Sequence, residues 1–158
     1  MRTLIVAALI LAAPLATAQT PAAPAAPAAS ASPVAAAART PSPPGAEVYI
    51  ISPKNGAKVK SPVAVQFGLK PVMGVAPAGV KFDNSGHHHL LIDTDAPADM
   101  AAPLPATDNI KHFGKGQTET SLTLPPGKHT LQLLLGDQSH IPHDPPVISK
   151  KITITVEK

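Results

Sequence analysis

Hydrophobic and polar residues alternate with a period of two in several short stretches between residues 46 and 158. This alternation is typical of β-strands with one buried face, because successive side chains of a strand point to opposite faces. The predicted strands are 47–52, 62–69, 87–93, 118–124, 128–135 and 151–156. Clusters of Pro, Gly, Asn and Asp separate them, and these residue types favour turns. No stretch shows a helical period that competes with this pattern.

Short strands separated by turns predict an all-β fold, specifically an immunoglobulin-like β-sandwich of about seven strands. Residues 51–67 resemble the first two strands of bacterial immunoglobulin-like domains, and residues 124–156 resemble their last three. Residues 94–116 depart from the pattern and leave the central strands undefined.

The first 18 residues have the three parts of a secretory signal peptide. Arg2 provides the positive start, Leu4 to Leu11 are apolar and uncharged, and Ala16-Thr17-Ala18 matches the small-x-small cleavage pattern. Cleavage before Gln19 would release a periplasmic or secreted protein. The apolar run is shorter than the ~20 residues of a membrane span. The chain has no cysteine for a lipid anchor.

Residues 19–45 consist mainly of Ala and Pro, with some Ser and Thr. Proline prevents a long helix, and the stretch has little to bury, so we expect a disordered linker that makes no contacts with the core of the domain. It either spaces the domain from the membrane or is tolerated low-complexity sequence. The expected regions are therefore a signal peptide (1–18), a linker (19–45) and a histidine-rich domain (46–158).

Charge and residue types exclude several classes of function. Apart from Arg2 and Arg39, the chain carries eleven lysines against ten acidic residues, with the signs interspersed, and 3% of its residues are aromatic. A nucleic-acid-binding surface needs a basic patch and aromatic residues for stacking, so we expect no such partner. Without cysteine there is no disulfide, no thiolate ligand and no blue-copper centre.

Seven histidines lie in the expected domain and are its most informative residues: His87, His88, His89, His112, His129, His140 and His143. Neutral imidazole is the commonest biological metal ligand. On a strand, His87 and His89 point to the same face about 7 Å apart, and His88 points to the other face. Both could reach one ion with bonds of about 2.0–2.1 Å.

The loop order of an immunoglobulin-like sandwich indicates which histidines converge. Its B–C, D–E and F–G loops lie at one end. His87 to His89 begin the strand after the B–C loop, His112 precedes strand E, and His140 to His143 lie in the F–G loop. We therefore expect these segments to meet at one rim. His129 begins strand F at the opposite end, and we interpret it as structural.

Three motifs are specific enough to indicate a family: Gly86–Asp93 (GHHHLLID), His112–Glu119 (HFGKGQTE) and Gly136–His143 (GDQSHIPH). They resemble the motifs of a secreted bacterial family of unknown function, family 4399. The resemblance spans roughly residues 75–156 and implies no established activity.

The sequence thus predicts a module that captures or buffers periplasmic copper or zinc. The predicted ligands are His87, His89, His112, His140 and His143, with His88, Met73 and Glu119 as further candidates. Nitrogen ligands with at most one thioether suit copper or zinc, whereas calcium and magnesium need clustered oxygen ligands. Met73 lies in the expected B–C loop and could serve Cu(I).

Two other interpretations stay open. The histidines could form a hydrogen-bonded network in a structural domain whose rim binds an envelope protein. Three histidines with an open position could also activate water on zinc, as in a hydrolase. The chain has no Gly-x-Ser-x-Gly elbow, no His-Glu-x-x-His helix and no carboxylate pair of suggestive spacing, so nothing further indicates an enzyme.

Overall fold

The computed structural model describes residues 39–158. The expected signal peptide and residues 19–38 of the expected linker lie outside the described residues. Within 39–158 the fold is all-β and contains no helix, which confirms the predicted class, and no described helix could cross a membrane. The strands are β1 (Val48–Ser52), β2 (Lys58–Lys60), β3 (Val63–Leu69), β4 (Gly74–Val75), β5 (Ser85–Ile92), β6 (Ile110–His112), β7 (Glu119–Leu122), β8 (Gly127–Gly136) and β9 (Ile152–Glu157).

All six strands expected from the alternation form, each within two residues of its expected ends. The described chain has nine strands, however, instead of about seven. The additional strands are β2, β4 and β6, which are two or three residues long. A period of two cannot be recognised over so few residues, so the sequence pattern misses them.

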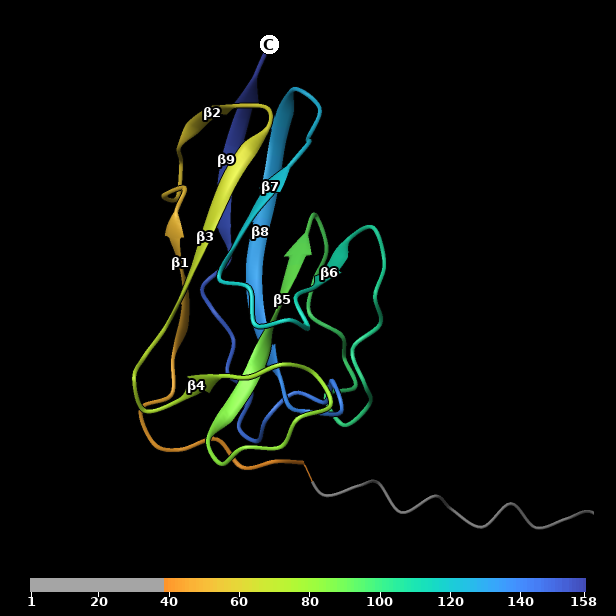
Figure 1. Cartoon of the computed structure of the whole chain (residues 1–158). Helices are drawn as coiled ribbons and strands as arrows, with labels where there is room; N and C mark the ends of the chain where they lie inside the picture. The colour runs from red at the N-terminus through yellow and green to blue at the C-terminus, as the bar shows by residue number, and fades with distance from the viewer. Residues whose placement is uncertain (1–38) are drawn as a thin grey trace, which may run out of the picture. The chain divides into compact units, whose positions relative to one another are not determined.

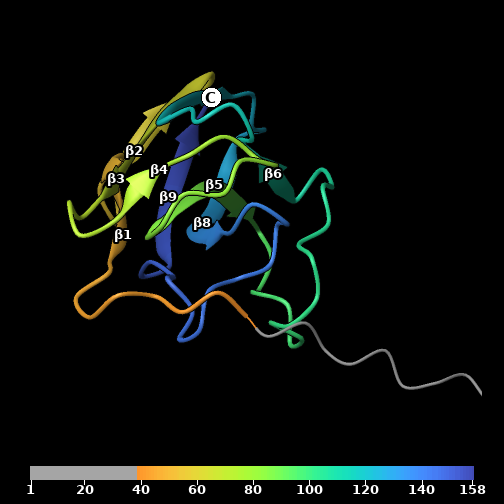
Figure 2. The ribbon, with the colours of Figure 1, turned by 60° about the horizontal axis from the view of Figure 1, so that its bottom comes forward.

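The strands form two sheets. The smaller sheet has the order β1-β3-β7 and is antiparallel throughout. The larger has the order β2-β9-β8-β5-β4, and β6 also pairs with β5. Its centre is antiparallel, whereas β2 runs parallel to β9 and β4 parallel to β5. In Figures 1 and 2, β1 and β3 lie to one side of β9, β8 and β5.

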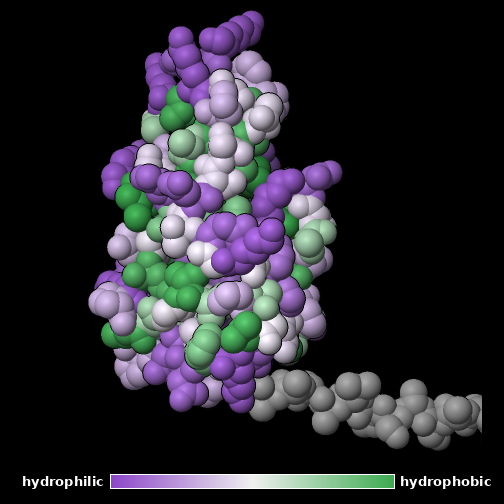
Figure 3. All heavy atoms as spheres, viewed as in Figure 1, coloured by the Kyte–Doolittle hydropathy of each residue, from purple (hydrophilic) through white to green (hydrophobic). Residues whose placement is uncertain are grey.

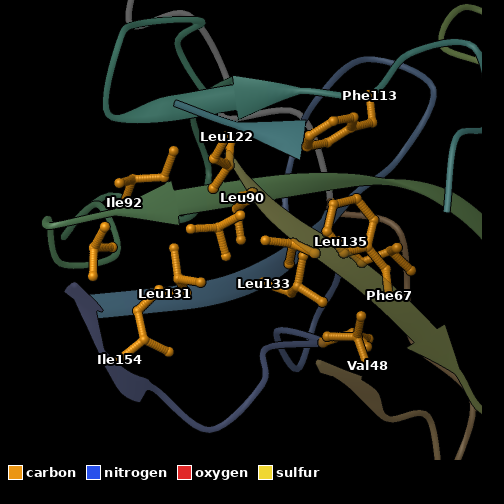
Figure 4. Packing of buried hydrophobic residues seen from close by; sticks show 14 of the residues in the cluster. Val48, Phe67, Leu90, Ile92, Phe113, Leu122, Leu131, Leu133, Leu135 and Ile154 are labelled. Carbon is orange, nitrogen blue, oxygen red and sulfur yellow. The ribbon is translucent and has the colours of Figure 1, made fainter. Parts of the chain in front are cut away.

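Apolar side chains from both sheets meet in one core. Alternate residues of β8, namely Leu131, Leu133 and Leu135, are fully buried, and Phe67 from β3 lies in the same cluster. Figure 4 shows side chains of the two sheets pointing toward one another. Burying each large apolar side chain contributes about 1.5–3 kcal/mol, so this core stabilises a domain that has no disulfide.

Strand β5 is buried on both faces. Leu90 faces the main core, whereas Leu91 packs with Leu104, Ile110 and Leu134 in a second cluster. Parts of the segment between β5 and β6, which gave no strand prediction, thus cover the outer face of β5. The same face carries His87 and His89.

Polar residues dominate the face of the molecule shown in Figure 3, where hydrophobic residues form separate spots. Within the described residues, most of the exposed large hydrophobic side chains belong to the segment between β3 and β5: Val72, Val75, Val80 and Phe82. Phe82 is the most exposed of them, at 62%. Four of the six exposed large hydrophobic side chains of the described residues therefore lie in this one segment.

Residues 39–45 belong to the expected linker but lie against the loop that follows β8, at the lower end of the view in Figure 1. The Arg39 guanidinium donates to the carbonyl oxygens of Pro142 and His143, and Thr40 Oγ1 donates to Asp137 Oδ2 at 2.6 Å. The last residues of the expected linker are therefore ordered against the domain, through polar contacts that its composition does not predict. Composition cannot reveal polar partners about 100 positions away in the sequence.

We expect a chain that begins at Ala46 to unfold at a temperature several degrees below that of a chain that begins at Arg39. Each lost hydrogen bond contributes about 0.5–1.5 kcal/mol, offset in part by the entropy of ordering these residues. A net loss of about 1–3 kcal/mol lowers the melting temperature of a domain of this size by several degrees. Thermal unfolding followed by circular dichroism would measure the difference, and equal melting temperatures would contradict it.

Candidate metal centre

The pairing of β5 with its neighbours fixes three histidines on one face of the larger sheet. His87 and His89 are two residues apart on β5, so both point to its outer face. On β6, His112 lies directly opposite His89. Directly opposite residues of an antiparallel pair share a face, so the His112 ring lies beside the other two.

The loop after β8 brings a fourth histidine over this face. The His140 amide donates to the Asp137 carbonyl at 2.9 Å, and the Asp137 amide donates to the Ile141 carbonyl at 2.9 Å. His140 has φ 66, in the left-handed region that non-glycine residues adopt in tight turns. This tight turn folds the chain back, so that the His140 ring contacts those of His87 and His112.

The four rings lie close together, and three of them bring ring nitrogens close enough to share one ion. The six distances between their centroids run from 4.7 Å, for His112 and His140, to 6.0 Å, for His89 and His140. With metal–nitrogen bonds of about 2.0–2.1 Å, imidazoles around a tetrahedral ion have centroids about 5 Å apart. One ring nitrogen each of His87, His89 and His112 already lies within 4.8 Å of the others.

Two glycines leave room for the rings. A β-carbon at Gly136, on β8 opposite His87, would lie 2.8 Å from Cε1 of His89. A β-carbon at Gly114, just after β6, would overlap the His112 ring. Neither glycine has a positive φ, so the close approach of the rings, and not backbone conformation, requires glycine here.

The buried imidazoles are uncharged and have no polar partner. Both ring nitrogens of His87 and His89, and Nε2 of His112, are buried without a hydrogen bond. Burial lowers the pKa of His89 to about 3 and that of His87 to about 4, with smaller contributions from the neighbouring histidines. Buried polar atoms are almost always paired in proteins. Converging, unprotonated nitrogens without partners therefore fit a metal ion.

The structure leaves two histidines of the predicted segments outside this cluster. His143 is buried, but its Nε2 lies 3.1 Å from the Ser85 carbonyl oxygen, and its ring contacts none of the other histidine rings in the described chain. His88 points to the opposite face of β5, where its ring packs 5.2 Å from Phe67 in the main core. The structure thus brings together four of the five predicted ligands.

The two non-histidine candidates lie away from the cluster. Met73 is buried in the main core between the sheets, where its thioether packs as an apolar group. Glu119 begins β7 opposite Gln66, and both side chains are exposed on the outer face of the smaller sheet. Both expectations are wrong, because proximity along the chain does not determine the face on which a side chain lies.

His129 lies near the start of β8, about 24 Å along the strand from Gly136 and the clustered rings. Its Nδ1 is 2.6 Å from Asp93 Oδ2, and its Nε2 is 2.9 Å from the Pro125 carbonyl. The hydrogen bond with Asp93 raises the pKa of His129. The separation of His129 from the other histidines is therefore confirmed.

Sequence reasoning missed the residues that shape and hold the cluster. Gly114 and Gly136 fall within two of the motifs quoted above, but the motifs do not say which ring each glycine accommodates. Asp137 follows Gly136 directly, and its carboxylate binds Thr40 and the backbone of the His140 loop. A short GD pair before the histidines is the only sequence signal for this role.

These observations define an all-β domain with a cluster of imidazoles that could hold a metal ion. The family model described as Domain of unknown function (DUF4399) matches residues 65–157, and the chain belongs to this family. The match runs from β3 to β9 and contains all four clustered histidines. No curated protein and no solved structure matches the chain.

Proposed function

We propose that this protein is an exported module that binds copper or zinc through His87, His89 and His112, with His140 as a fourth ligand. The observation that carries the proposal is the convergence of buried, unpaired and uncharged ring nitrogens within 4.8 Å. Neutral imidazole is the form that ligates, so lowered pKa values leave these residues ready to bind at neutral pH.

The ligand type favours copper or zinc over harder cations. The nearest carboxylate in the loop is that of Asp137, whose oxygens accept hydrogen bonds from Thr40, Ser139 and Ile141. This carboxylate is therefore engaged in holding the loop. Nitrogen ligands alone suit copper and zinc, whereas calcium and magnesium require several oxygen ligands.

Access to the cluster supports capture and release more than catalysis. His87 and His89 are fully buried, whereas His112 and His140 are partly exposed, so an ion would enter from the side of these two rings. A zinc hydrolase needs an open coordination position for water. The His140 ring lies beside the other three, with its centroid 4.7–6.0 Å from theirs, and would compete with water for that position. We therefore favour a module that captures or buffers the ion.

The sheet order also supports the proposal of an immunoglobulin-like sandwich. In that interpretation β1, β3 and β7 correspond to strands A, B and E, and β5, β8 and β9 to strands C, F and G. We further propose that the protein acts in the periplasm or outside the cell. That proposal rests on the signal-peptide pattern of residues 1–18.

The direct test is the metal content and stoichiometry of the untagged protein. We expect elemental analysis of exported protein, and competitive titration with Cu(II) and Zn(II), to show one bound ion per chain. A ligand at 100 times its dissociation constant stabilises the folded state by about 2.7 kcal/mol, so the same ion should raise the melting temperature. A protein that binds neither ion, at neutral pH and without chelator, would contradict the proposal.

A further inference from the structure

The loop that carries His140 is organised by one carboxylate. Asp137 Oδ1 accepts hydrogen bonds from the amides of Ser139 at 2.8 Å and Ile141 at 3.0 Å. These two amides flank His140, whose own amide donates to the Asp137 carbonyl. Asp137 is buried, with 4% of its surface exposed, so its contacts within the protein fix the path of the loop.

The other oxygen of the same carboxylate is held by the start of the described chain. Residues 39–42, which we call the arm, cross the loop. Thr40 Oγ1 donates to Asp137 Oδ2 at 2.6 Å, and Arg39 Nε donates to the Pro142 carbonyl at 3.0 Å. The Asp144 amide donates to the Thr40 carbonyl at 2.9 Å. The arm thus binds the loop on both sides of His140 in the sequence.

His140 depends on such contacts more than the other clustered histidines do. Its left-handed backbone is unfavourable for a non-glycine residue and persists only where the surroundings impose it. His87, His89 and His112 are instead fixed by strand pairing in the larger sheet. Loss of the arm should therefore displace the fourth ring and leave the other three in place.

We propose that Thr40 and Arg39 are positioning residues that hold His140 over the other three histidines, and that these two residues of the arm thereby support the metal centre. The inference rests on the proposed metal-binding function and specifies how its fourth ligand is kept in place. Thr40 acts through Asp137, and Arg39 acts on the backbone that follows His140.

The test uses the full chain with Thr40→Val, which keeps the shape of the side chain and removes its hydroxyl. Removal of a residue that orients a metal ligand typically weakens affinity about 10–100-fold, so we expect at least a tenfold loss for Cu(II). The electron paramagnetic resonance spectrum of the Cu(II) complex should change toward that of His140→Ala. Thr40→Ser retains the donor and should restore both properties.

Two controls separate positioning from general stability. Ser42 lies in the same arm, but its hydroxyl donates to the Pro145 carbonyl and not to Asp137, so Ser42→Ala should leave the affinity unchanged. In a His140→Ala background, Thr40→Val should cause no further loss, because residues that act as a unit are non-additive.

The experiment separates failure of this inference from failure of the proposed metal-binding function. If the parent protein binds neither Cu(II) nor Zn(II), the metal-binding proposal itself is overturned. If the parent binds and Thr40→Val lowers only the melting temperature, with unchanged affinity and spectrum, the arm is merely structural and this inference alone is overturned.

Discussion

Replacement of both His87 and His89 by alanine is expected to abolish tight binding of Cu(II) and Zn(II). These two side chains are fully buried at the centre of the cluster and supply two of the three nitrogens that lie within 4.8 Å of one another. A site left with His112 and His140 has only half of its ligands. The metal-dependent rise in melting temperature, about 2.7 kcal/mol in stability at 100 times the dissociation constant of the parent, should vanish.

His129→Ala is the matched control, because it removes the same chemical group from the far end of β8. We expect it to retain the parent affinity for both ions, even if loss of the contact with Asp93 lowers its stability. The comparison is made within each protein, as the difference in melting temperature with and without metal. A double variant that keeps the full metal-dependent shift would show that the ion binds elsewhere.

The sequence predicts those parts of the fold that depend on neighbouring residues, and it misses those that depend on residues far apart in the chain. The alternation in β1, β3 and the first part of β8 reflects a core on one face and is visible locally. β5 is buried on both faces, and its outer cover comes from residues such as Leu104 and Ile110. Leu104 lies in irregular chain and Ile110 begins the three-residue strand β6, so neither belongs to a recognisable period, and only the folded structure reveals that they cover the sheet.

The sequence likewise predicts one part of the candidate site and misses another. The pleat of a strand places His87 and His89 together and sends His88 to the opposite face, which the sequence predicts. His112 joins them because β6 pairs with β5, and β6 is too short to be recognised.

The separation of His140 from His143 depends on the left-handed turn at His140, and nothing in the sequence specifies this turn. The contacts of Arg39 and Thr40 with the loop after β8 span about 100 residues, which no local pattern can show.

The metal-free protein is expected to lose stability steeply as the pH falls below 6.5. Burial lowers the pKa of His87 and His88 to about 4 and of His89 to about 3, whereas the unfolded chain has values near 6.5. At a pH between these pKa values, the unfolded state binds more protons than the folded state. The contribution of the three histidines to the free energy of unfolding is therefore fully present above about pH 6.5, and it is lost as the pH falls below that value. Each histidine lowers the free energy of unfolding by up to about 1.4 kcal/mol per pH unit, and the three together lower it by up to about 4 kcal/mol per pH unit.

His129 acts in the opposite direction. Its hydrogen bond with Asp93 raises its pKa, so its contribution to stability is present in acid and is lost as the pH rises through that raised value. Urea unfolding of the metal-free protein between pH 7 and pH 4.5 would measure the net slope, which we expect to follow the three buried histidines. A stability that stays constant over this range would contradict their lowered pKa values.

His88→Leu isolates one of the three contributions without touching the metal ligands. The His88 ring lies in the apolar core beside Phe67, and the Gln117 backbone approaches it without forming a hydrogen bond to either ring nitrogen. Leucine removes buried, unpaired polar atoms that cost about 1–3 kcal/mol, so the variant should be more stable than the parent at pH 7. The loss of unfolding free energy per pH unit below pH 6.5 should be about a third smaller than in the parent, because one of the three buried histidines is gone. Since His88 faces away from His87 and His89, the affinity for Cu(II) should stay at the parent value, and a loss of affinity would place His88 among the ligands instead.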